Sequence, residues 1–100
     1  MVDYLDGLDH AGVPREDRAL AALGPRVLKL SAERTAGAHP YLVTPEHTRR
    51  AREILGPDAL LAPDQKVVLD TDPERARAIG RPAIARYLGL RNYTLSLIHI

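Results

Sequence analysis

The chain has 100 residues, which is enough for one small domain, and its 14 Lys and Arg residues against 13 Asp and Glu residues leave a formal net charge of +1. Such a balance gives no basic field of the kind that attracts nucleic acid. Without Cys the chain can form no disulfide or thiolate metal site, so redox chemistry would need a cofactor. No apolar run approaches the roughly 20 residues of a membrane span and no signal-peptide pattern opens the chain, so we expect a cytoplasmic protein that binds neither nucleic acid nor membrane.

The first predicted element is a short helix over residues 1–10. Val2, Leu5 and Leu8 fall on one side of it and acidic residues on the other, which is the pattern of an amphipathic helix. The helix is expected to end at Gly12, and residues 15–18 are expected to form a charged loop or a single helical turn.

Residues 19–43 predict one βαβ unit. The apolar run Ala19–Leu23 indicates a strand, Gly24 and Pro25 mark a tight turn, and apolar residues then recur at helical spacing until the break at residues 35–37. A second strand is expected over Gly37–Val43. In such a unit the strand-to-helix turn lies at the carboxyl edge of a parallel sheet, where ligands of α/β folds bind.

The Gly24-Pro25 turn is compatible with anion binding. Gly24 permits close backbone approach, Pro25 suits the first helical position, and the free N–H groups of the first turn favour an anion, to which Arg26 adds positive charge. Residues 24–27 are therefore a candidate phosphate site. The alternative is plain turn chemistry, because Gly-Pro commonly precedes a helix.

His39 and Tyr41 alternate with apolar residues in the second strand, so both are expected to point to one face of it. At the carboxyl end of a barrel strand they would line a substrate pocket. The alternative, weighed equally, is that local backbone groups satisfy both side chains. Pro40 makes a central strand less favourable because it cannot donate to the ladder, and neither residue is predicted to be catalytic.

Further elements follow with clear capping signals. Thr44-Pro45-Glu46 predicts a helix start, and the helix is expected to stop at Gly56. After a connection over residues 58–65, Lys66–Leu69 is predicted as a buried strand. A last helix is expected over residues 73–88, kinked or divided at Pro82, with an inner side formed by Ala76, Ile79, Ala83, Ile84, Tyr87 and Leu88. Thr71 or Asp72 is expected to cap this helix. The spacing of Asp70 and Asp72 is attributed to turn and cap formation, and no metal site is predicted.

The order LAALGPRVLKLSAERTAGAHPYLVTPEHTRRAREILGP, followed by LLAPDQKVVLDTDPERARAIGRPAIARYLGLRNY, resembles the C-terminal half of the luciferase-like monooxygenase superfamily, in particular its probable F420-dependent oxidoreductases. The resemblance covers residues 1–93. The chain departs from the family at Ala36, where the lead-in to a barrel strand has Asp, and in a turn poorer in glycine. Residues 94–100, TLSLIHI, do not match and are expected to be an atypical, β-prone tail, either truncated or out of frame.

The resemblance implies a partial (β/α)8 TIM barrel of C-terminal βα units only, because a complete barrel needs about 250 residues. It implies hydride transfer between coenzyme F420 and a small organic substrate, with Leu23, Gly24, Pro25 and Arg26 at the cofactor phosphate. Alternatives are an FMN-dependent monooxygenase on the same scaffold, or an inactive fragment that acts as an interaction module with an exposed sheet edge. A homo-oligomer is left open for the complete barrel, and no catalytic residue is assigned.

Overall fold

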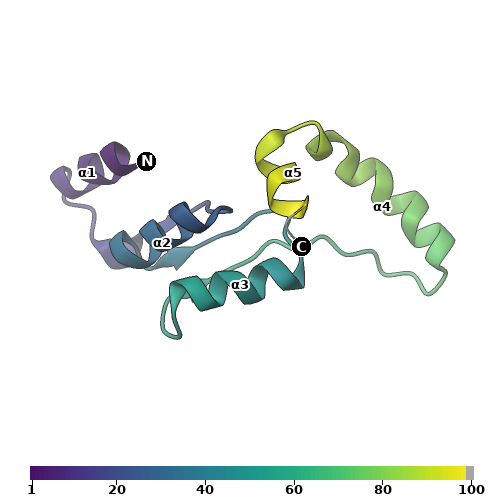
Figure 1. The fold of residues 1–100 in the computed structure, drawn as a ribbon, viewed down its shortest axis with the longest axis horizontal. Coiled ribbons are helices and arrows are strands. Elements are labelled where there is room, and N and C mark those ends of the chain that lie inside the picture. Colours follow the sequence, from purple (N-terminus) through teal and green to yellow (C-terminus); the bar gives the residue numbers. More distant parts are fainter. Residues whose placement is uncertain (99–100) are drawn as a thin grey trace.

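A computed structural model describes residues 1–98 as an α/β chain built on a small parallel sheet (Figure 1). One short 3-10 turn, η1, precedes the first strand. The elements in chain order are α1 (Val2–His10), η1 (Arg15–Asp17), β1 (Ala19–Leu20), α2 (Pro25–Arg34), β2 (Gly37–Ala38), α3 (Pro45–Leu55), β3 (Leu60–Leu61), α4 (Pro73–Leu88) and α5 (Arg91–Ile98).

The sheet has the order β1-β2-β3, and both neighbouring pairs are parallel. Ala19 pairs with Gly37, and Gly37 pairs with Leu60. The βαβ unit predicted from residues 19–43 is therefore confirmed, and a second unit follows through α3. The regular strands are shorter than predicted, with two residues each. Backbone bonds nonetheless continue the β2–β3 ladder, since the N–H of Asp64 donates to the Pro40 carbonyl at 2.7 Å.

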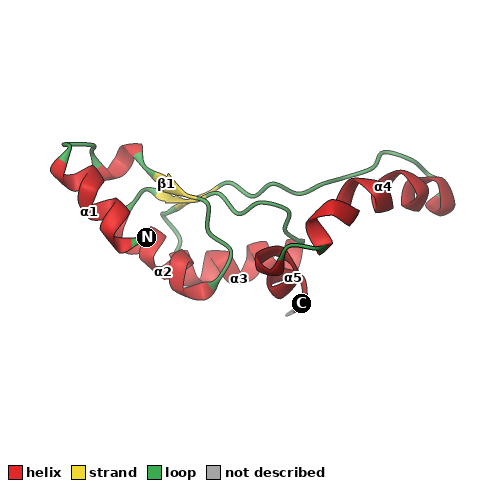
Figure 2. Ribbon diagram, turned by 90° about the horizontal axis from the view of Figure 1, so that it is seen from above, coloured by secondary structure: helices red, strands yellow, loops and turns green. Residues whose placement is uncertain are grey.

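Helices α2 and α3 cover one face of the sheet and leave the other face open (Figure 2). Their apolar sides supply most of the core, because alternate strand residues point toward them. The buried apolar cluster consists of Leu5, Leu20, Ala22, Leu28, Ala38, Ala51 and Leu55. The opposite face carries the exposed residues Ala21, His39 and Leu60.

Thr35 joins the end of α2 to β2. It is 2 % exposed, and its hydroxyl lies 2.7 Å from the Ser31 carbonyl while it accepts the Gly37 N–H at 3.0 Å. One buried hydroxyl thus satisfies backbone groups of both the last helical turn and the strand that follows. The break in helical periodicity at residues 35–37 has this physical basis.

The predicted strand over Lys66–Leu69 is wrong. These residues form no regular element in the structure, and Val67 and Leu69 are 81 % and 104 % exposed. The third strand lies earlier, at Leu60–Leu61, within the stretch that the sequence suggested was a connection. The helix predicted over residues 73–88 is confirmed in its bounds, but it is one helix that passes through Pro82.

Two expectations about the C-terminal region are also corrected. No residue of α4 is buried, and of its predicted inner side only Ala76, Ile84 and Tyr87 are partly covered. Residues 91–98 form helix α5, which contacts α4 after the turn at Gly89, whereas a β-prone tail was expected from residue 94 onward. The end of the predicted tail, His99 and Ile100, lies outside the described residues.

The overall shape is elongated. Principal extents are 51 × 28 × 22 Å, because the segment after β3 runs away from the sheet and α4 then returns toward it, with α5 following (Figure 1). Among residues 1–98, the helices are too short or too polar to cross a bilayer.

Candidate functional site

The carboxyl edge of the sheet collects the residues predicted to bind ligand. The β1–α2 turn, the end of β2 and the segment after β3 all leave the sheet there, because the strands are parallel. Ligands of parallel α/β sheets bind at this edge. The predicted cofactor and substrate residues come from two of these three connections.

The β1–α2 turn presents unpartnered backbone donors. Gly24 is the N-cap of α2 in an extended conformation, Pro25 follows it, and no side chain caps the helix. The first intrahelical bond runs from the Leu28 N–H to the Gly24 carbonyl at 3.0 Å. The N–H groups of Arg26 and Val27 therefore remain for an external acceptor, as at helix N-termini that bind anions.

Helices α3 and α4 differ from α2 in this respect. The Thr44 hydroxyl accepts the His47 N–H at 3.2 Å, and an Asp72 carboxylate oxygen accepts the Glu74 N–H at 3.0 Å. The predicted Thr44 cap is confirmed, and of the two caps expected for α4, Thr71 or Asp72, the structure has Asp72. The side chain of Arg26 is exposed beside the uncapped turn of α2, so positive charge and free donors lie together there.

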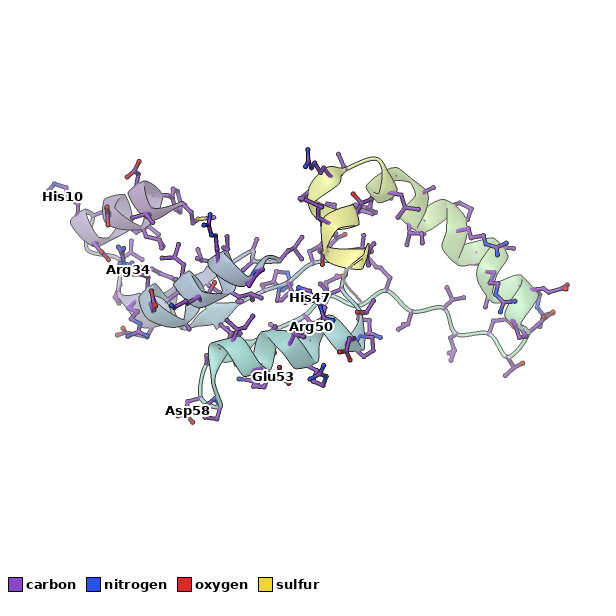
Figure 3. The ribbon with its side chains drawn as sticks, viewed as in Figure 1. His10, Arg34, His47, Arg50, Glu53 and Asp58 are labelled. Carbon is purple, nitrogen blue, oxygen red and sulfur yellow. The ribbon has the colours of Figure 1, made fainter. Side chains whose placement is uncertain are left out.

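Leu23, the first residue predicted at the cofactor, is held by a histidine that the sequence did not single out. His47 is 9 % exposed, and its Nε2 lies 2.8 Å from the Leu23 carbonyl. A carbonyl only accepts, so Nε2 carries the hydrogen. In Figure 3, His47 lies on α3 toward the strands, while Glu53 lies on the outer side. His47 therefore fixes the start of the β1–α2 turn from the neighbouring helix.

His39 replaces a ladder donor that Pro40 lacks. Its Nδ1 lies 2.5 Å from the Ala62 carbonyl, on the strand neighbour. Because Pro40 has no N–H for that strand, the imidazole N–H of the preceding residue satisfies the carbonyl instead. This is the local-backbone alternative weighed for His39, and it explains how a proline is accommodated between two strands.

Tyr41 belongs to a different cluster. Its hydroxyl lies 3.0 Å from the hydroxyl of Tyr87 on α4, and its ring centroid lies 6.0 Å from that of Tyr93 on α5. The ammonium of Lys66 lies 4.6 Å from the Tyr41 ring centroid. Among residues 1–98, no hydrogen bond joins Tyr41 to His39, so the two predicted pocket residues lie on one strand end but have separate partners.

A depression in the described surface lies at the opposite edge of the sheet. Its volume is about 570 Å³, and its lining comes from segments that precede the strands, including Arg15, Thr35, Ala36, Asp58 and Ala59. Arg15 is occupied there, because its guanidinium donates to the carbonyls of Ala32 and Thr35 at the end of α2. The depression is wide and shallow and stands apart from the predicted ligand residues, so we assign it a structural role.

Asp70 and Asp72 have the turn and cap roles that the sequence predicted. Asp70 accepts the Asp72 N–H at 2.8 Å and pairs with Arg75, while Asp72 caps α4. Their carboxylates are thus engaged with the chain itself.

Comparison of the chain with models of protein families, with curated proteins and with solved structures finds no match. A function can therefore be proposed only from the residues, their geometry and the resemblance to the luciferase-like monooxygenase superfamily.

Proposed function

We propose that the chain is the C-terminal part of a (β/α)8 barrel in a cytoplasmic F420-dependent oxidoreductase. The observation that supports the proposal most strongly is the uncapped N-terminus of α2 at the carboxyl edge of a parallel sheet, with Arg26 exposed beside it. A helix N-terminus in this position is suited to a phosphate group. The bound deazaflavin would supply the two-electron chemistry, as the acceptor or donor of a hydride.

The chain's own residues would bind and orient the phosphate. The N–H groups of Arg26 and Val27 donate to its oxygens, and the Arg26 guanidinium supplies the opposite charge. Gly24 leaves room, since a Cβ placed on it would meet nothing within 4 Å. His47 keeps the turn in place through the Leu23 carbonyl. The organic substrate would lie near Tyr41, at the neighbouring strand end.

A titration of coenzyme F420, followed by its fluorescence, tests the proposal on the chain and on any longer product of the same gene that contains it. We expect Arg26→Ala to weaken F420 binding about tenfold, the order of one charge-assisted hydrogen bond. Lys29→Ala is the matched control, because it removes one positive charge from the exposed side of the same helix and should leave the affinity unchanged.

Equal affinities of the two variants would contradict the phosphate assignment. Titration of FMN under the same conditions separates the two cofactors, and tighter binding of FMN would favour the monooxygenase alternative. If neither cofactor binds to either protein, the interaction-module alternative gains support, for which the open face and edge strand at Leu60 (50 % exposed) provide a surface.

A further inference from the structure

The hydroxyl of Tyr41 lies among groups that favour its ionised form. Tyr87 is its hydrogen-bond partner at 3.0 Å, and the Lys66 ammonium stands 4.6 Å from its ring centroid. The three residues come from the end of β2, from α4 and from the segment after β3. The three residues are far apart in the sequence, so the tertiary fold, and not their spacing along one helix, brings them together.

The backbone beside Tyr41 is in a strained conformation. Leu42 has a φ of 55° and is the single non-glycine residue with positive φ among the described residues. It is also 6 % exposed, so burial of its side chain holds the conformation in place. Branched side chains rarely adopt this region, and such strain concentrates at functional sites. This conformation directly follows Tyr41 in the chain.

Charged and titratable neighbours of the cluster come from every element around it. The Tyr87 hydrogen bond and then Lys66 lower the pKa of Tyr41, while partial burial and the Asp64 charge raise it. The same hydrogen bond raises the pKa of Tyr87, and once Tyr41 is ionised only Tyr87 can donate it. Arg86 lies 5.4 Å from the Tyr87 ring centroid, and Tyr93 packs on both tyrosines.

We propose that Tyr41 is the proton-transfer group of the carboxyl-edge site, with Lys66 and Tyr87 as its positioning residues. For the substrate this means an alcohol or its carbonyl counterpart. In the oxidative direction the substrate O–H bond would break as its proton forms the O–H bond of an ionised Tyr41, the carbonyl double bond would form, and a bound deazaflavin would accept the hydride from the substrate carbon. This chemistry rests on the proposed function. Lys66 stabilises the phenolate and Tyr87 donates to it.

Chemical labelling tests the proposal without requiring a cofactor. An arylsulfonyl fluoride reacts with a phenolate: the O–S bond forms, the S–F bond breaks and fluoride leaves. Peptide mapping by mass spectrometry then gives the rate at each tyrosine. Tyr4 is the internal reference, because it is 65 % exposed and lies on α1, away from the cluster. At pH 8 we expect Tyr41 to react at least about threefold faster than Tyr4, since the phenolate fraction follows the pKa.

Two lysine variants distinguish activation of the Tyr41 hydroxyl by Lys66 from mere exposure of that hydroxyl to the reagent. Lys66→Met retains much of the side-chain volume and removes the charge, so the Tyr41 rate should fall to that of Tyr4 and its pH profile should move to higher pH. Lys29→Met removes a charge from α2 and should change neither. A Tyr41 rate no higher than that of Tyr4, or an unchanged profile in Lys66→Met, would overturn the proposal.

The two proposals fail separately. If F420 does not bind but Tyr41 is labelled rapidly in a Lys66-dependent manner, the cofactor assignment is wrong and the activated phenol stands. If F420 binds with the expected dependence on Arg26 but Tyr41 reacts like Tyr4, the proton-transfer role is wrong and the cofactor assignment stands.

Discussion

One buried arginine organises the N-terminal region. Arg18 is 7 % exposed, its guanidinium donates to the Val13 carbonyl, and it pairs with the Asp9 carboxylate at 2.5 Å. Arg34, at the end of α2, pairs with the same carboxylate at 2.7 Å and with Asp6 at 2.9 Å. Asp9 thus connects α1 to β1 and α2, and holds the first helix on the βαβ unit.

This network predicts how the stability of α1 depends on pH. Hydrogen bonds from Arg18, with Arg34, hold the pKa of Asp9 below its ordinary value. Since the folded-state pKa is lowered, the stabilisation is present above the unfolded pKa and is lost as pH falls through the folded pKa. We expect amide exchange in α1 to accelerate below about pH 4, as measured by hydrogen exchange after correction for the intrinsic rate.

Asp9→Asn is the matched variant, because it keeps the side-chain size and removes the titration. In this variant the protection of α1 should be lower at pH 7 and should change less between pH 6 and acid than in the parent chain. Asp3→Asn, on the same helix, serves as control. A parent-like acid transition in Asp9→Asn would show that another group controls the docking of α1.

At the residue scale, helix caps could be predicted from the sequence, but hydrogen bonds between residues far apart in the sequence could not. Thr44 and Asp72 cap the helices that they immediately precede, so sequence spacing suffices to find them. The role of His47 depends on the Leu23 carbonyl, 24 residues away in sequence. A histidine near a helix start can have many roles, and the packing of α3 against α2 brings this one to the Leu23 carbonyl.

The pairing of β2 with β3 depends on one glycine. A Cβ added to Gly37 would lie 1.9 Å from the Leu60 carbonyl oxygen, which is backbone and cannot rotate away. We expect Gly37→Ala to separate the two strands and to lower the free energy of unfolding by about 2–4 kcal/mol, within the range of severe single substitutions. Urea unfolding followed by circular dichroism measures the change.

Gly7→Ala is the comparison for this prediction. Gly7 lies within α1, and an added Cβ would meet nothing within 4 Å. Since alanine favours the helix over glycine by up to about 1 kcal/mol, this variant should be as stable as the parent or more so. Equal effects of the two substitutions would show that close approach at Gly37 does not decide the pairing.

The same contact explains why the third strand was misplaced in the sequence interpretation. Val67, Val68 and Leu69 are apolar and largely β-branched, so composition favours them as a strand. The position of β3 is instead set by Gly37, which accommodates the Leu60 carbonyl, and by the short connection after α3. By Lys66 the chain has passed the end of β2, and no backbone partner remains in line with it.

At the scale of the whole molecule, the sequence predicted the βαβ order but not how little of the chain packs together. The radius of gyration is 15.7 Å, against about 13 Å for a compact domain of 100 residues. The helical pattern of residues 73–88 indicates an apolar side, and Ile79 is nevertheless 57 % exposed. Periodicity shows that a face is apolar, but it does not show that a partner surface lies within the same 100 residues.

The uncovered apolar side chains predict self-association of the chain. Val67, Leu69 and Ile79 are 81 %, 104 % and 57 % exposed on the segment after β3 and on α4, and extensive exposed apolar surface often marks a site of association. We expect the apparent mass from size-exclusion chromatography with light scattering to rise between about 10 and 500 µM, because association follows mass action.

Replacing Val67 and Leu69 with Lys should restore the monomer mass at the highest concentration, since two charges on this segment would have to be desolvated in the contact. The matched control replaces Val2 and Tyr4, 50 % and 65 % exposed on α1, with Lys and should associate like the parent. A monomer mass for the parent at every concentration would contradict the prediction, and association that survives the Lys substitutions would move the contact to the open face of the sheet around Leu60.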